Sequence, residues 1–435
     1  MDAPKEDVFP AFKDGDTHIT ITGTRQYQLH SMILKSISPT FERVLAIEGP
    51  AKLTTKAIKR GAVIRNRLLM VINVDEYGTE SCVLEAIPLD DEGRSTIGNQ
   101  VGLDLENGRV VPAYVLAYEA VLGACYNIPI DLGDFENDAM ADILNTALEI
   151  VEVAEYLDCV HIITKSIEAV LLATGQTLHQ SIQRYPIAWL SFASRLRSRI
   201  IFREALIHGA GQFNCKGIAA EVENLPKAVS DILTKKAKVL MAAMQQAEMK
   251  ILSYYPSHLQ REKTVGRADK DNTGRASYAN DVMSWIALTV LRHFFAQNLC
   301  NGNTHNAEDM GWEVVTAIMA GGDTYLNKPQ LESFHNLFPM SRKGAGVVEH
   351  RLDEMKELIK SFVRDLAKNE SQLDIRLFPV KHFTCTTVDI HDYPWNTGYG
   401  AAAAGDSSDE EVDGPEVMYV EDITEDYDHV GRYED

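Results

Sequence analysis

One apolar stripe at helical spacing dominates the middle of this chain. Asn224-Leu225-Pro226 supplies helix-start chemistry, and the apolar positions from Val229 to Ile251 then keep to one helix face until Pro256. Comparable stretches follow at 278–299 and 348–366. The spacing therefore predicts that residues 176–396 form a mostly α-helical domain.

The preceding residues, 14–175, mix strand and helix signals. Thr17–Thr22 alternates polar and apolar residues as a half-buried strand does, and Tyr27–His30 returns after a Gly-Thr turn. A helical pattern over 31–46 is interrupted by Pro39. Further predicted elements are a hairpin formed by 67–74 and 81–87, a short strand at 101–105, and helices at 114–126, 140–157 and 159–173. The fold class predicted for the whole chain is α+β.

Charge separates a third zone from these two. The chain carries a net charge of −21, and residues 405–435 hold thirteen Asp and Glu residues against one basic residue, Arg432. Such a block repels itself and lacks the apolar residues needed for a core. Residues 397–435 are therefore predicted to be a Gly/Ala linker followed by a disordered acidic tail. Because phosphate neutralisation needs basic residues, nucleic acid is not expected as a direct partner.

Composition also indicates the cellular compartment in which the protein is expected. No apolar run reaches the roughly 18 residues that a membrane helix needs. The first residues lack the basic and apolar regions of a secretory signal. Six cysteines occur without a CxxC pair, which is typical of a reduced protein rather than a disulfide scaffold. We therefore expect a cytoplasmic or nuclear protein with no membrane partner.

A spaced motif follows the first predicted hairpin. After Asp16, the chain presents His30, then Leu34, Ser38 and Phe41 at four, eight and eleven residues further on. This pattern resembles the BTB/POZ signature, and the stretch ending at Tyr126 is similar to the central helix of that family. The resemblance covers 14–175 and implies a BTB/POZ fold, with the hairpin at 67–87 as an insertion. Three later strings resemble BTB proteins of filamentous fungi, without implying an activity: 201–208, 251–256 and 338–344.

The motif residues are expected to be structural. Leu34 and Phe41 lie two helical turns apart and can point into one core. Ser38, before Pro39, suits a helix end where its hydroxyl satisfies a free backbone group. His30 is interpreted as a capping or packing residue. The residue after it is Ser31 rather than the basic residue with which the opening Asp pairs in BTB repressors, so Asp16 lacks that partner.

The BTB resemblance implies a non-enzymatic protein that acts by binding other proteins. The leading hypothesis is a substrate adaptor that joins a cullin-3 ubiquitin ligase scaffold to a substrate held by 176–396. The alternatives are a scaffold that self-associates through its BTB domain and, less favoured, a transcriptional regulator. An enzyme hidden in 176–396 ranks last, since the sequence contains neither a GxSxG elbow nor an HExxH motif.

No catalytic, cofactor-binding or metal-binding residue is predicted. The loop starting at Asp269 imitates half of an EF-hand, but Asn280 stands where a calcium loop needs a bidentate carboxylate. Ser407 and Ser408 precede acidic residues and are candidate phosphorylation sites. The run from Lys52 to Arg67 holds six basic residues and no acidic one. It is interpreted as a solvated face, or alternatively as a docking site for the acidic tail.

Overall fold

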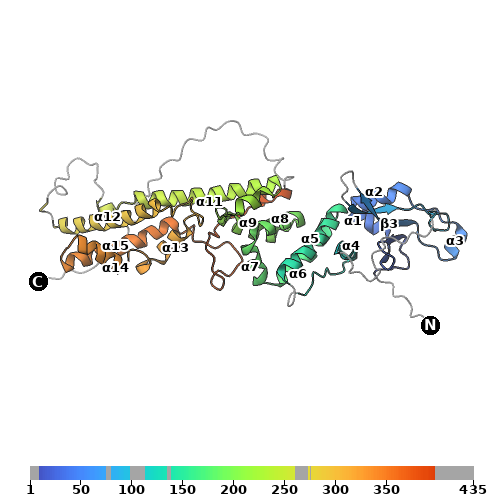
Figure 1. Ribbon diagram of the computed structural model, residues 1–435, viewed down its shortest axis with the longest axis horizontal. Coiled ribbons are helices and arrows are strands. Elements are labelled where there is room, and N and C mark those ends of the chain that lie inside the picture. The colour runs from blue at the N-terminus through green and yellow to red at the C-terminus, as the bar shows by residue number, and fades with distance from the viewer. Residues whose placement is uncertain are drawn as a thin grey trace, which may run out of the picture.

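A computed structural model describes residues 9–74, 80–97, 113–134, 139–259, 273–274 and 276–396. The molecule is elongated, with a small sheet at the N-terminal end and long helices at the other (Figure 1). The first part contains β1 (Thr17–Thr20), β2 (Gln26–Leu29), α1 (Ser31–Ile37), α2 (Pro39–Glu48), α3 (Thr55–Lys59), β3 (Asn66–Val74) and β4 (Glu80–Ala86). Helices α4 (Ala113–Ala124), α5 (Met140–Tyr156) and α6 (Val160–Ala173) follow.

The remaining described chain is mostly helical. It comprises α7 (Gln176–Arg184), α8 (Pro186–Leu196), α9 (Arg199–Gly211), α10 (Ile218–Glu223), α11 (Lys227–Ser253), α12 (Tyr278–Cys300), α13 (Trp312–Ala320), α14 (Lys328–Leu337) and α15 (Arg342–Val363). Short 3-10 turns lie at Ser257–Leu259, Gly322–Thr324, Ile390–Asp392 and Pro394–Asn396. The prediction of an α+β chain with a small N-terminal sheet and a mostly helical remainder is confirmed.

Within the described residues the strands form one four-stranded sheet in the order β2-β1-β3-β4. β1 pairs antiparallel with β2 and parallel with β3, where Ile19 faces Leu68. β3 and β4 form the antiparallel hairpin, with Met70 opposite Leu84. The hairpin predicted to be an insertion thus supplies a central strand of the sheet. The predicted strand at 101–105 lies outside the described residues.

The break at Pro39 divides the first helical run into α1 and α2. Ser38 is the N-cap of α2: its hydroxyl accepts a 3.0 Å hydrogen bond from the Phe41 N–H and donates to the Leu157 carbonyl. Pro39 occupies the first helical position, where its missing N–H costs no hydrogen bond. The sequence therefore turns the chain at this point without leaving a backbone group unsatisfied.

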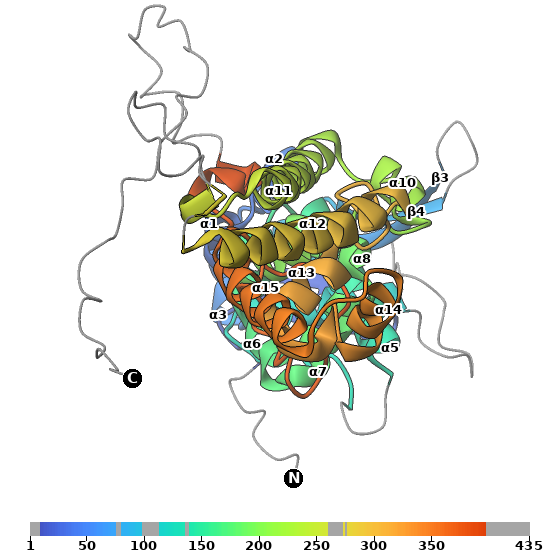
Figure 2. The same ribbon diagram turned by 90° about the vertical axis from the view of Figure 1, so that its left-hand side faces the viewer.

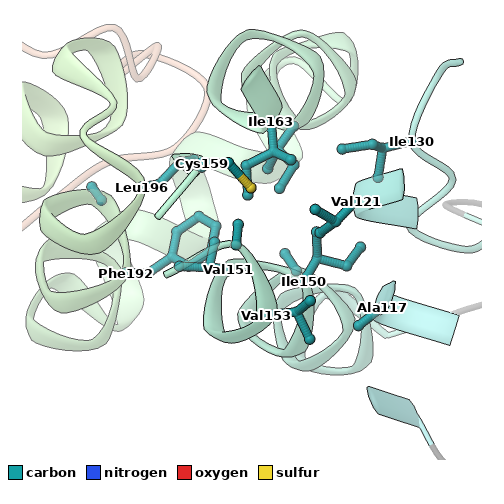
Figure 3. Close-up of a cluster of buried hydrophobic side chains, with 14 of the residues drawn as sticks. Ala117, Val121, Ile130, Ile150, Val151, Val153, Cys159, Ile163, Phe192 and Leu196 are labelled. Atoms are coloured by element: carbon teal, nitrogen blue, oxygen red, sulfur yellow. The ribbon is translucent and has the colours of Figure 1, made fainter. Parts of the chain in front are cut away.

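Two apolar clusters hold the described chain together. The first runs from the sheet through α9 to Val229 and Leu233 of α11, and the second gathers the rest of α11 with α12, α13, α14 and α15. Figure 3 shows part of the first cluster, where α4, α5 and α6 meet α8; its labelled residues are Ala117, Val121, Ile130, Ile150, Val151, Val153, Cys159, Ile163, Phe192 and Leu196. Because α11 contributes to both clusters, this one helix joins the two ends of the molecule (Figure 1).

The last described residues return from α15 to α9. Gly211, at the end of α9, lies so close to this segment that a Cβ atom there would collide with the Phe383 carbonyl oxygen. Trp395 packs edge-on against Phe202 at a centroid distance of 5.2 Å, and Asp392 forms a 2.6 Å ion pair with Lys236 of α11. The segment therefore ends beside α9 and the first half of α11.

Candidate interaction site

The residues of the spaced motif have structural contacts. Asp16 accepts two 2.6 Å hydrogen bonds from Ser31, one from the backbone N–H and one from the hydroxyl. The His30 N–H donates to the Tyr126 hydroxyl at 2.8 Å, so the structure brings these two motif residues together. Leu34 and Phe41 lie fully buried in the first apolar cluster. Ser31, at the position that is basic in BTB repressors, is thus the hydrogen-bond partner of Asp16. Ser407 and Ser408 lie outside the described residues.

A buried polar cluster joins α9 to the C-terminal segment. Glu204 and His208 face Ser371 and His382, and all four side chains are at least nine-tenths buried. The His208 Nδ1 lies 2.9 Å from the His382 Nε2, and the His208 Nε2 lies 3.0 Å from the Ser371 Oγ. The Ser371 hydroxyl donates to Glu204, whose carboxylate also accepts from the Gln372 N–H at 3.0 Å. Each of these four side chains therefore has a hydrogen-bond partner inside the cluster.

The ionisation of the cluster follows from these contacts. Burial alone would raise the pKa of the Glu204 carboxyl, but hydrogen bonds from His208, Ser371 and Gln372 lower it to about 2. Burial, with the neighbouring His208, lowers the pKa of His382 to about 3. Sequence inspection missed this cluster because Ser371 lies 167 residues from Glu204. The one available signal is the spacing of Glu204 and His208, four residues apart on one helix face.

A serine, a histidine and a glutamate in contact invite comparison with a hydrolase triad. A nucleophilic serine must reach a substrate and pass its proton to the histidine. Here the Ser371 hydroxyl donates to Glu204 instead, and the side chain is 8% exposed. An adjacent 360 Å³ hollow is lined by His179 and Glu204 but not by Ser371 or His208. This arrangement is that of a structural junction.

Among the described residues, no group of three or more His, Cys, Asp or Glu side chains is placed to hold a metal ion. Asp269 to Asn272, which open the EF-hand-like loop, lie outside those residues. No described helix is both long and apolar enough to cross a membrane.

A large apolar recess in the helical half lies between α12 and α14. Figure 2 views the molecule from this end, with α12 running across the front and α14 below it. The groove has a volume of about 870 Å³. Its described lining contains no Lys, Arg, Asp or Glu, and consists of Trp285, Ile286, Thr289, Val290, His293, Phe294, Gln297, Leu326, Gln330, Ser333, Phe334, Leu337, Phe338 and Met340. Trp285 is 49% exposed, Phe338 60% and Leu337 76%.

Local sequence explains why these side chains face outward. In α12, Ala287, Leu288 and Leu291 face α15 and are buried, so the intervening positions 285, 289 and 293 point to the other side. α14 begins with a capping box in which Asn327 and Gln330 satisfy each other's backbone N–H groups. Leu331 then anchors α14 in the second cluster, while Leu337 and Phe338 at its end project into solvent.

A second recess, of about 830 Å³, lies between α4, α5 and residues 128–133. Its lining mixes apolar residues with charged ones, including Arg25, Glu119 and Asp142. Because its described lining carries no charged side chain, the recess between α12 and α14 is the more apolar of the two.

An exposed, uncharged apolar groove between helices is the kind of surface that binds proteins. In the comparison with known families, a family model of the fungal FF domain matches residues 256–365, about a quarter of the chain. FF domains mediate protein–protein interactions. The match includes α12, α13, α14 and all of α15, and so contains the described lining of the groove. No curated protein and no solved structure matches the chain.

The match corrects the family inferred from the spaced motif. The family model that matches is the FF domain, and no BTB/POZ family matches, so the BTB identity of 14–175 is wrong. The ligase-adaptor function implied by that resemblance is unsupported for the same reason. The spacing of His30, Leu34, Ser38 and Phe41 has a local cause. A strand followed by two short helices with a capping serine between them produces it without any shared family.

Proposed function

We propose that this chain is a protein-interaction protein whose groove between α12 and α14 binds a short apolar segment of a partner protein. The observation that carries the proposal is the exposure of Trp285, Leu337 and Phe338 around an uncharged recess inside the part that matches the FF domain. Large apolar side chains at this exposure gain free energy when a partner covers them, about 25 cal/mol for each Å² buried.

The surroundings of the groove define the chemistry of the partner. The uncharged lining favours two or three apolar or aromatic anchors at helical spacing, as in other helix-in-groove complexes. Arg342 and Lys343, both exposed, follow Met340 at one end, where the N-terminus of α15 also lies. The positive end of this helix dipole adds to their charge. The proposed partner segment therefore carries acidic residues beside its apolar anchors.

The proposal includes no catalytic step. It is supported by the burial of the junction of Glu204, His208, Ser371 and His382 and by the direction in which Ser371 donates. Polar side chains arranged in this way hold two parts of a fold together, whereas catalytic side chains must contact a substrate.

The proposal is tested with peptides selected from a random 16-residue display library against the full chain. Selected peptides should share apolar anchors with acidic flanks and should compete for one site. Leu337→Asp places a charge in the groove and should weaken their binding at least about tenfold. Met32→Asp on α1 is the matched control, because Met32 is 79% exposed and Leu337 76%. Fluorescence anisotropy of a labelled peptide gives each Kd.

Two results would contradict the proposal. One is the recovery of no binding peptide; the other is equal weakening by Leu337→Asp and Met32→Asp. Circular dichroism of both variants shows whether either substitution disturbs the fold. Light scattering with and without peptide establishes whether the groove instead holds a second copy of the chain, in which case the peptide would lower the measured mass.

A further inference from the structure

We infer that the groove between α12 and α14 has an occupant in the same chain: residues 416–422, Glu-Val-Met-Tyr-Val-Glu-Asp, which cover the groove and compete with partners. The inference rests on the proposed function, since it requires that the groove bind apolar segments. It adds a regulatory step, because a partner must then displace this internal segment.

The composition of the segment matches the groove. Val417 to Val420 are four consecutive apolar residues, the longest apolar run within the acidic block 405–435. Exposure of these apolar side chains to water is unfavourable. In the proposed complex they are buried against Trp285, Phe334 and Phe338 of the groove, which removes apolar surface from water. Tyr419 brings an aromatic ring to a recess whose own lining is rich in aromatic rings, where offset or edge-on contacts are favourable.

The acidic residues that flank the apolar run also match the basic residues beside the groove. Glu416 precedes the apolar run, and Glu421 and Asp422 follow it. Arg342 and Lys343 are exposed in the first turn of α15, next to the groove residue Met340. The positive end of the helix dipole favours an acidic flank near the N-terminus of a helix, in addition to the attraction of the basic side chains.

The chain is long enough to make this contact. The last described residues are held beside α11 by the ion pair of Asp392 with Lys236. From Lys236 to the end of α11 at Ser253 the helix rises only about 26 Å. The Tyr255 ring, just beyond, lies 6.0 Å from the ring of Trp285 in the groove. The residues between Asn396 and Val417 span up to roughly 70 Å when extended. The groove is therefore within reach, and tethering supplies a high effective concentration.

The basic run from Lys52 to Arg67 is the competing site for an acidic tail. Its basic residues are largely exposed around α3, so its charge is available. However, α3 lies at the opposite end of the molecule from α12 and α14 (Figure 1). Attraction to α3 would also leave Val417 to Val420 without an apolar recess as large as the groove. The groove satisfies both the apolar run and its acidic flanks, so we assign the segment to the groove.

The test uses full-length chains and the labelled peptides described above. In one variant Val417, Met418, Tyr419 and Val420 are each replaced by Asp. In the matched control Ala401, Ala402, Ala403 and Ala404 are each replaced by Asp, which adds the same charge outside the segment. The first variant should bind groove peptides at least about tenfold more tightly than the wild type, and the control should bind like the wild type.

Hydrogen–deuterium exchange on the same three proteins locates the effect. Residues 285–297 and 330–340 should exchange faster in the first variant than in the other two proteins. Equal Kd values in all three proteins would overturn the inference while leaving the proposed function intact, provided that Leu337→Asp still weakens binding. Altered exchange at 52–67 in place of the groove would also overturn it. If no peptide binds the groove in any of the proteins, the proposed function fails and the inference fails with it.

Discussion

The junction of α9 with the C-terminal segment and the groove between α12 and α14 show opposite combinations of residue type and solvent exposure. The junction consists of Glu204, His208, Ser371 and His382, residue types typical of active sites, yet they are buried and bonded to one another. The groove consists of residue types typical of cores, yet Leu337 and Phe338 lie largely in solvent. The comparison teaches that exposure, more than residue type, separates structural side chains from those available for binding.

The largest expected effect comes from breaking the junction. Glu204→Ala removes the acceptor of the Gln372 N–H and of the Ser371 hydroxyl, and it leaves the Ser371 hydroxyl buried without that acceptor. We expect a loss of about 3 kcal/mol in the free energy of unfolding, measured by urea titration with circular dichroism. The matched control is Glu308→Ala, which removes an exposed ion pair with Lys216 and should leave the midpoint unchanged. Equal midpoints for the two variants would show that the junction does not stabilise the fold.

A smaller effect is expected from pH. The pKa values of both His382 and Glu204 are lowered in the folded chain, to about 3 and about 2. The unfolded chain therefore binds protons first as the pH falls. The stability that neutral His382 contributes is complete above pH 6.5 and is lost as the pH falls toward 3; that of Glu204 is complete above pH 4.5 and is lost toward pH 2.

His382→Gln keeps a hydrogen-bonding side chain at this position but removes the titrating ring. Its unfolding free energy should fall less steeply than that of the wild type between pH 6.5 and 4.5. The difference in slope is at most about 1.4 kcal/mol per pH unit, the value for one proton. Urea titrations at several pH values measure both slopes, and parallel slopes would count against a neutral buried His382.

The smallest effect is expected on the groove side of the comparison. Leu337→Ala should change the unfolding free energy by less than about 0.5 kcal/mol, since the side chain is already in solvent. Leu331→Ala, on the same helix but 6% exposed, should cost about 2 kcal/mol or more because it leaves a cavity. If Leu337→Ala proved as costly as Leu331→Ala, Leu337 would be a packing residue, and the groove would lose one of its three exposed anchors.

Local patterns predicted much of the fold. The alternation in Thr17–Thr22, the break at Pro39 and the stripe from Val229 to Ile251 each depend on neighbouring residues, and each has its counterpart in the structure. The parallel pairing of β1 with β3 could not be read in the same way, because it joins residues about 49 positions apart through α1, α2 and α3. The hairpin consequently looked like an insertion rather than a central part of the sheet.

Neither candidate region could be predicted from the sequence, for the same physical reason. The junction depends on contacts between α9 and a segment about 170 residues away. The groove exists only because α12 and α14 lie side by side, and no local pattern distinguishes the exposed Leu337 and Phe338 from buried apolar residues. The spaced motif shows the converse error, since a local pattern with a local structural cause was interpreted as the mark of a family.

Hydrogen–deuterium exchange of the full-length variant in which Val417 to Val420 are replaced by Asp, with and without a saturating selected peptide, is the most direct test of the central claim. We predict that protection on binding is concentrated in residues 285–297 and 330–340, which line the groove. Protection confined to another surface, such as the recess between α4 and α5, or no change anywhere despite measured binding, would contradict the assignment of the groove as the interaction site.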